Sequence, residues 1–62
     1  MPQFRKCEKK FLEILKLFEE NNDVHLQIYI LEEMVEYSSK ENDYQRTITY
    51  YKMLNNIYKK RH

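Results

Sequence analysis

The feature that most constrains the fold is a pair of helix-period segments, residues 24–39 and 43–58, joined by a short polar run. In the first segment, apolar side chains recur every three or four residues on two separate faces. One face contains Val24, Ile28, Leu31, Val35 and Ser38, and the other contains Ile30, Met34 and Tyr37. A helix that is apolar over so much of its circumference has neighbours on more than one side. Residues 24–39 are therefore predicted to form the central helix.

The helix predicted for residues 43–58 also carries two apolar stripes. Its main stripe consists of Tyr44, Ile48, Tyr51, Leu54 and Tyr58, and its second stripe consists of Tyr50, Met53 and Ile57. Asn42, followed three residues later by Gln45, fits a capping box at the start of this helix. The main stripe is expected to complete the core, which leaves the second stripe for another contact.

Another helix is predicted for residues 3–20, before the other two in the chain. Its apolar face consists of Phe4, Cys7, Phe11, Ile14, Leu15 and Phe18. Asparagine tolerates the left-handed conformation that ends helices, and either Asn22 or Asp23 can cap the helix that follows. The connection between this helix and the next is only residues 21–23, and so short a connection joins antiparallel neighbours. Residues 1–62 are therefore predicted to form one all-α domain, a three-helix up-down-up bundle.

Size and composition exclude several classes of protein. A chain of 62 residues buries a small core, and its single cysteine, Cys7, cannot form an internal disulfide. It contains no glycine, so a phosphate-binding loop is excluded. Its longest apolar run has four residues, whereas a membrane span needs about 20. The formal net charge of +1 favours no polyanionic partner. We therefore expect a cytoplasmic protein with no membrane contact, stabilised by regular helix packing or by association with another chain.

One motif resembles a known family. The run that carries it is Asn42-Asp43-Tyr44-x-x-Thr47-Ile48-x-Tyr50-Tyr51-Lys52-x-Leu54. It resembles the turn and second helix of a tetratricopeptide repeat. The same register places Leu31 at the first large apolar position of the repeat and Met34 at its leucine. The chain departs from the family at four positions, where glycine, tyrosine, alanine and proline are replaced by Val35, Ser38, Thr47 and Lys59.

The resemblance implies one and a half helical hairpins. Residues 24–58 would form one repeat, and residues 3–20 would be the second helix of an incomplete preceding repeat. The pattern Phe11-x-x-x-Leu15-x-x-Phe18 also recurs 33 positions later, starting at Tyr44. Repeats rich in Asn, Lys, Glu and Tyr look most like those of the peptide-pheromone receptors of Gram-positive bacteria and their phages. The function implied is a non-enzymatic protein- or peptide-binding module, for example a small regulator.

The chain offers little chemistry for catalysis, so no catalytic residue, metal or cofactor is expected. Cys7 lies on an apolar stripe, where a thiol usually acts as a small buried hydrophobe. His25 is placed beside a helix cap, with no acid or nucleophile positioned near it in the sequence. Glu32, Glu33 and Glu36 are interpreted as a solvated face. The two histidines, His25 and His62, cannot supply the four ligands of a structural zinc site.

A protein or peptide partner is expected to bind to tyrosine-containing surfaces. Tyrosine and methionine are enriched at protein interfaces. The candidate residues for binding a partner are Tyr50, Met53, Ile57 and Tyr29. The alternative is that these side chains only complete the core. We expect a symmetric homodimer formed through the second stripe of the helix at residues 43–58, with Leu12 and Leu17 of the helix at residues 3–20 as the next choice.

A small DNA-binding regulator acting as a dimer is the alternative function. Lys59, Lys60 and Arg61 would then contact phosphate groups. A second basic cluster consists of Arg5, Lys6, Lys9 and Lys10. The up-down-up order predicts that these two clusters lie at opposite ends of the bundle, which disfavours a continuous nucleic-acid track.

Overall fold

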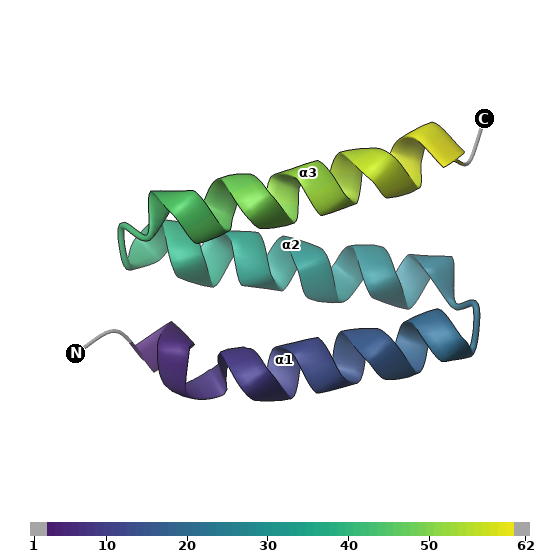
Figure 1. The fold of residues 1–62 in the computed structure, drawn as a ribbon, viewed down its shortest axis with the longest axis horizontal. Coiled ribbons are helices and arrows are strands. Elements are labelled where there is room, and N and C mark those ends of the chain that lie inside the picture. The colour runs from purple at the N-terminus through teal and green to yellow at the C-terminus, as the bar shows by residue number, and fades with distance from the viewer. Residues whose placement is uncertain (1–2, 61–62) are drawn as a thin grey trace.

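A computed structural model describes residues 3–60 and has three α-helices in those residues. They are α1 (Gln3–Glu20), α2 (Val24–Lys40) and α3 (Tyr44–Lys60). Figure 1 shows them running antiparallel, with α2 between α1 and α3 and the two termini at opposite ends. The molecule is a slab of 37 × 20 × 13 Å. The all-α, up-down-up bundle with a central second helix is confirmed.

The two turns have the same construction. Asn22 and Asn42 adopt left-handed backbone conformations, with φ of 55° and 61°. In the first turn the backbone N–H of Asp23 donates to the Phe18 carbonyl at 2.9 Å, and the N–H of Asn22 donates to the Glu19 carbonyl at 3.1 Å. These two bonds define a Schellman motif, which satisfies carbonyls at the end of α1. The second turn repeats both bonds one helix later.

An aspartate follows each left-handed asparagine and starts the next helix. An Asp23 carboxylate oxygen accepts the backbone N–H of Leu26 at 3.1 Å, and an Asp43 oxygen accepts that of Arg46 at 3.3 Å. Of the two caps proposed for α2, Asp23 is therefore the one used. The capping box predicted from Asn42 and Gln45 is wrong, because Asn42 ends α2 in a left-handed conformation and Asp43 caps α3.

The turns repeat at a different spacing from the 33-position recurrence in the sequence. Asn22 and Asn42 are 20 positions apart, so the chain repeats once per helix at that spacing. The sequence correspondence at 33 positions joins Phe11, in the middle of α1, to Tyr44, the first residue of α3. These two residues are not structurally equivalent, because they lie at different heights along their helices. Three apolar residues at helical spacing can occur at any height, so the correspondence carries no structural meaning.

The core lies along α2, where all three helices contribute. Its buried apolar side chains are Phe4, Leu15, Ile30, Leu31, Met34, Tyr50 and Leu54. Ser38 is fully buried, and its hydroxyl lies 2.8 Å from that of Thr47, with which it shares a hydrogen bond. A small side chain at this point lets α3 approach α2 next to the turn.

Cys7 does not take the buried place predicted for it. The thiol is exposed, and Ile14, two turns further along α1, is also partly exposed. The inner face of α1 is instead centred on Phe4 and Leu15, with Glu8 half-buried beside it. Glu8 has charged and hydroxyl partners on α3 that hold it against the bundle.

Candidate interaction surfaces

The outer face of α3 carries four exposed large apolar side chains, whereas α1 and α2 carry three each in the described residues. The four on α3 are Tyr44, Ile48, Tyr51 and Tyr58, which are 42–62% exposed. Their spacing of four, three and seven residues places them in one row along the helix. We call this row the outer stripe. Large apolar side chains gathered in this way on a small protein mark an interaction surface more often than a passive one.

The outer stripe shows that the two faces predicted for α3 are exchanged. Tyr50 is 5% exposed and packs edge-on against Phe4, at 6.0 Å between ring centroids. Met53 and Ile57 are half-buried and pack against the core. Of the main stripe that was expected to face inward, Leu54 alone is buried. The burial of Tyr50 contradicts its predicted contact with a partner, and Met53 and Ile57 are the members of the second stripe that retain exposed surface.

A groove between α2 and α3 extends the outer stripe toward α2. It has a volume of about 450 Å³, with Val35 and Leu54 among its apolar lining residues. Tyr29 from α2 and Tyr51 and Tyr58 from α3 also line it. Its remaining lining side chains are polar: Glu32, Glu33, Glu36 and Asn55. The groove therefore combines aromatic rings with several carboxylates, an environment suited to a cationic side chain.

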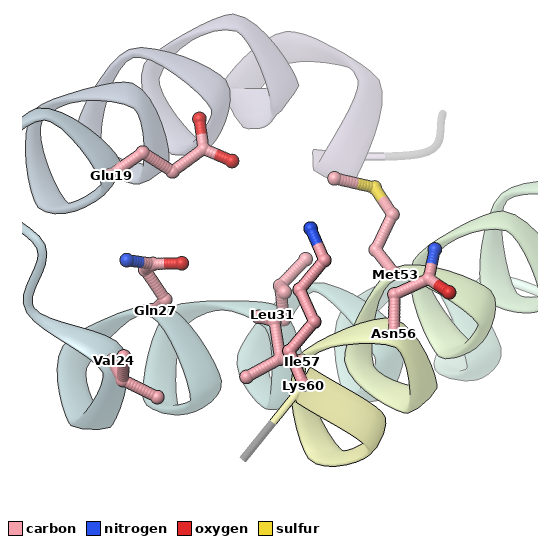
Figure 2. Close-up of a pocket in the computed structure, with 8 residues that line it drawn as sticks. All are labelled: Glu19, Val24, Gln27, Leu31, Met53, Asn56, Ile57 and Lys60. Carbon is pink, nitrogen blue, oxygen red and sulfur yellow. The ribbon is translucent and has the colours of Figure 1, made fainter. Parts of the chain in front are cut away.

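Met53 and Ile57 line a different groove, between the C-terminal ends of α1 and α3, with a volume of about 330 Å³ (Figure 2). Leu31 of α2 also lines it. Glu19 of α1 and Lys60 of α3 provide its charged lining (Figure 2). The structure therefore separates the predicted partner-binding residues: Tyr29 lines one groove, and Met53 and Ile57 line another.

A third groove, of about 560 Å³, lies between α1 and α2. Its apolar lining comes from Phe4, Cys7, Phe11, Ile14 and Tyr37. The rings of Phe11 and Tyr37 pack with 5.8 Å between centroids. Lys10, Lys40 and Glu41 provide its charged groups. Apolar lining and flanking lysines distinguish this groove from the acidic one between α2 and α3.

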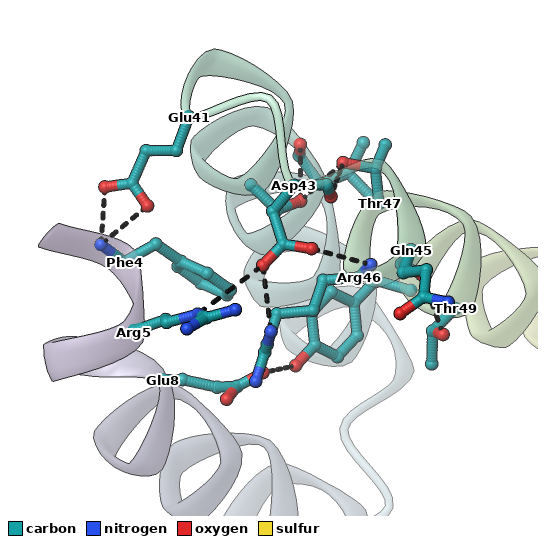
Figure 3. Close-up of polar contacts among 12 residues, drawn as sticks. Phe4, Arg5, Glu8, Glu41, Asp43, Gln45, Arg46, Thr47 and Thr49 are labelled. Atoms are coloured by element: carbon teal, nitrogen blue, oxygen red, sulfur yellow. Dashed lines mark hydrogen bonds and ion pairs between the residues drawn. The ribbon is translucent and has the colours of Figure 1, made fainter. Parts of the chain in front are cut away.

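A polar cluster joins the N-terminal part of α1 to the start of α3 (Figure 3). The Arg46 guanidinium donates to Glu8 at 2.7 Å and to Asp43 at 2.8 Å. The Tyr50 hydroxyl donates to the same oxygen of Glu8. Arg5 adds a looser ion pair with Asp43, at 4.0 Å. The cluster could not be predicted from the sequence, because Glu8 and Arg46 are 38 positions apart and share no motif.

The cluster shifts the ionisation of its members. The hydrogen bond from Arg46 lowers the pKa of Glu8 below its usual value, although burial opposes the shift. Burial alone would raise the pKa of Asp43, but the hydrogen bonds from Arg46 outweigh it and lower that pKa. Burial, and then the hydrogen bond to Glu8, raise the pKa of Tyr50. With these ion pairs and hydrogen bonds in place, the cluster serves to hold helices together.

Acid is expected to weaken the fold through this cluster. Because the pKa values of Glu8 and Asp43 are lower folded than unfolded, their stabilisation is complete above about pH 4.5. It is lost as pH falls through the lowered values. Urea unfolding at pH 6 and pH 3 should show this loss, and Glu8→Gln should reduce stability at pH 6 while flattening the acid dependence. Glu13→Gln, an exposed position on the same helix, is the control. An unchanged acid dependence in Glu8→Gln would contradict this role.

The start of α1 makes a second contact, with the α2–α3 turn. The Glu41 carboxylate accepts the backbone N–H of Phe4 at 2.6 and 2.9 Å (Figure 3). A carboxylate at the N-terminus of a helix satisfies an open donor and complements the helix dipole. This contact fixes the angle at which α1 lies against the hairpin of α2 and α3.

The basic residues of the alternative function are distributed as predicted. Lys59 and Lys60 are exposed in the last turn of α3, whereas Arg61 lies outside the described residues. The opposite basic cluster starts near Arg5, at the other end of the slab (Figure 1). Two clusters separated by the length of the molecule do not form one track for a phosphate backbone.

Within residues 3–60, no group of three His, Cys, Asp or Glu side chains is placed to hold a metal ion. None of the three helices is both long and apolar enough to cross a membrane. His25 is exposed, and His62 lies outside the described residues. Comparison with known proteins found no matching family model, no matching curated protein and no matching solved structure.

Proposed function

We propose that this protein is a small, non-enzymatic protein-binding module that self-associates through the outer stripe of α3. The observation that carries the proposal is the row of four half-exposed apolar side chains, three of them tyrosines. Tyrosine suits an interface, because its ring can be buried while its hydroxyl stays in contact with water. A homodimer places two copies of the same stripe together, which is the commonest symmetric solution for soluble proteins.

The resemblance to tetratricopeptide repeats supports the same surface. In that family, helical hairpins stack side by side, so the last helix of an array has an uncovered face. The outer stripe of α3 corresponds to such a face, and a second copy would occupy the place of a following repeat. Ser38 and Thr47, at the family's tyrosine and alanine positions, pair at 2.8 Å where the helices approach. One helix with its turn takes 20 residues, so a hairpin of two helices is longer than the family's ~34 residues. The proposal therefore rests on the exposed outer stripe and not on the repeat length.

The association is expected to be weak to moderate. Covering the exposed half of each of the eight stripe side chains in a dimer contributes about 1–1.5 kcal/mol per side chain, since full burial contributes roughly 1.5–3 kcal/mol. Association has to offset about 4 kcal/mol or more of lost translational and rotational freedom. A dissociation constant on the order of 10–1000 µM is therefore expected.

Tyr51→Lys is expected to weaken self-association at least tenfold, because it places a charge in the middle of each stripe. Sedimentation equilibrium over a range of about 10 µM to 1 mM measures the effect. Leu17→Lys is the matched control, since Leu17 on α1 is 57% exposed and Tyr51 is 55% exposed. A wild-type protein that stays monomeric throughout would contradict the proposal. Loss of association in Leu17→Lys alone would move the interface to α1.

The alternative as a DNA-binding protein is tested separately. An electrophoretic mobility assay with duplex DNA at two salt concentrations should show no tight, salt-sensitive binding by the protein. If such binding occurs and is lost on Lys59→Ala with Lys60→Ala, the proposed function is replaced by the alternative.

A further inference from the structure

The outer stripe has opposite charges on its two sides. On the side facing α2, the groove that it borders is lined by Glu32, Glu33 and Glu36. On the side facing away from α2, Lys52 lies one turn beyond Ile48, and Lys59 lies two turns beyond Lys52. Both lysines are exposed. The stripe is therefore acidic along one edge and basic along the other.

This charge pattern distinguishes the two ways in which identical stripes can meet. A two-fold axis parallel to the α3 helices brings the basic edge of each copy against the acidic edge of the other. A two-fold axis perpendicular to the helices makes them antiparallel, and it brings acid against acid and base against base. Like charges across an interface oppose association, so the parallel arrangement is favoured.

We propose that two copies pack through their outer stripes with the α3 helices parallel, so that Lys52 of each copy enters the acidic groove of the other. The inference rests on the proposed function and adds the orientation of the dimer. The groove suits a lysine for two reasons. Glu32 and its neighbours supply opposite charge, and Tyr29 and Tyr51 supply aromatic rings that attract a cation.

Height along the helices identifies the carboxylate nearest to Lys52. Ser38 and Thr47 are in contact, and α2 and α3 run antiparallel, so each step toward the C-terminus of α3 is matched by a step toward the N-terminus of α2. Five steps place Lys52 level with Glu33 and close to Glu32. Glu36, one turn away, already pairs with Lys40 at 3.1 Å. Glu33 is half-buried, whereas Glu32 is exposed, so Glu32 is the residue chosen for the test.

A charge-exchange experiment tests the pairing. Lys52→Glu alone and Glu32→Lys alone should each weaken self-association about tenfold, because two exposed ion pairs per dimer become two repulsions. The variant with both changes should recover most of the wild-type affinity, measured by sedimentation equilibrium at low salt. Glu13→Lys, on the exposed face of α1, is the control and should have no effect. Additive losses in the double variant would overturn the proposed pairing.

Disulfide trapping tests the orientation independently of charge. In a Cys7→Ser background, Tyr44→Cys should form a disulfide-linked dimer with itself, because a parallel arrangement places the two copies of position 44 opposite each other. An antiparallel arrangement instead brings position 44 against position 58, about 21 Å along the helix, beyond the reach of a disulfide. Tyr51→Cys lies at the middle of the stripe and should cross-link in either orientation. Cross-linking of Tyr51→Cys without Tyr44→Cys would overturn the parallel arrangement while leaving the proposed function intact. Absence of both, with a wild-type protein that is monomeric, would reject the function itself.

Discussion

Replacing Tyr50 with alanine is expected to lower the free energy of unfolding by about 3–5 kcal/mol, the range for removing a large buried aromatic side chain. The same replacement at Tyr51, its neighbour in the sequence, is expected to lower that free energy by only about 1 kcal/mol, since about half of its side chain is already in water. Tyr50 is 5% exposed, packs against Phe4 and donates its hydroxyl hydrogen bond to Glu8. Tyr51 is on the outer stripe and is 55% exposed.

Urea unfolding of dilute protein, in which the chain is monomeric, measures both variants. A domain of this size has a stability of only ~3–5 kcal/mol, so Tyr50→Ala should be largely unfolded in the absence of denaturant. Tyr50→Phe separates the hydroxyl from the ring and should cost about 1 kcal/mol, the contribution of one hydrogen bond. Equal losses of stability at positions 50 and 51 would contradict the orientation of α3 in this structure.

Met34→Ala is the second change expected to have a large effect, a loss of about 2–5 kcal/mol in the free energy of unfolding. Met34 is 0% exposed and lies in the middle of α2, where side chains from all three helices surround it. Truncation leaves a cavity that the surrounding helices cannot close without losing other contacts.

Two comparison variants make the Met34 result specific. Met34→Leu keeps most of the volume and should cost less than about 1.5 kcal/mol. Met53→Ala removes a half-buried methionine on α3 and should cost less than Met34→Ala, because less of its surface leaves water on folding. Circular dichroism during thermal unfolding, at equal protein concentrations, provides the measurement. A larger loss for Met53→Ala would show that the core is centred on α3 and not on α2.

The helices and their order could be predicted from the sequence because they depend on residues close together in the chain. The asparagine–aspartate turns end one helix and cap the next through bonds that span at most five residues. The central position of α2 also followed from local information, since its apolar residues cover more than one face. The capping prediction at Asn42 was wrong because an asparagine can either cap the following helix or end the preceding one. Its left-handed backbone selects the second role.

The tertiary structure alone decided which face of α3 turns inward. Both of its stripes are apolar and have helical spacing, so periodicity could not choose between Tyr50 and Tyr51. The choice depends on partners distant in the sequence: Ser38 leaves room for Thr47, and Glu8 on α1 binds both Arg46 and the Tyr50 hydroxyl. Sequence periodicity determines that a helix has an apolar face, whereas the shape and charge of the neighbouring helices determine which of two such faces is buried.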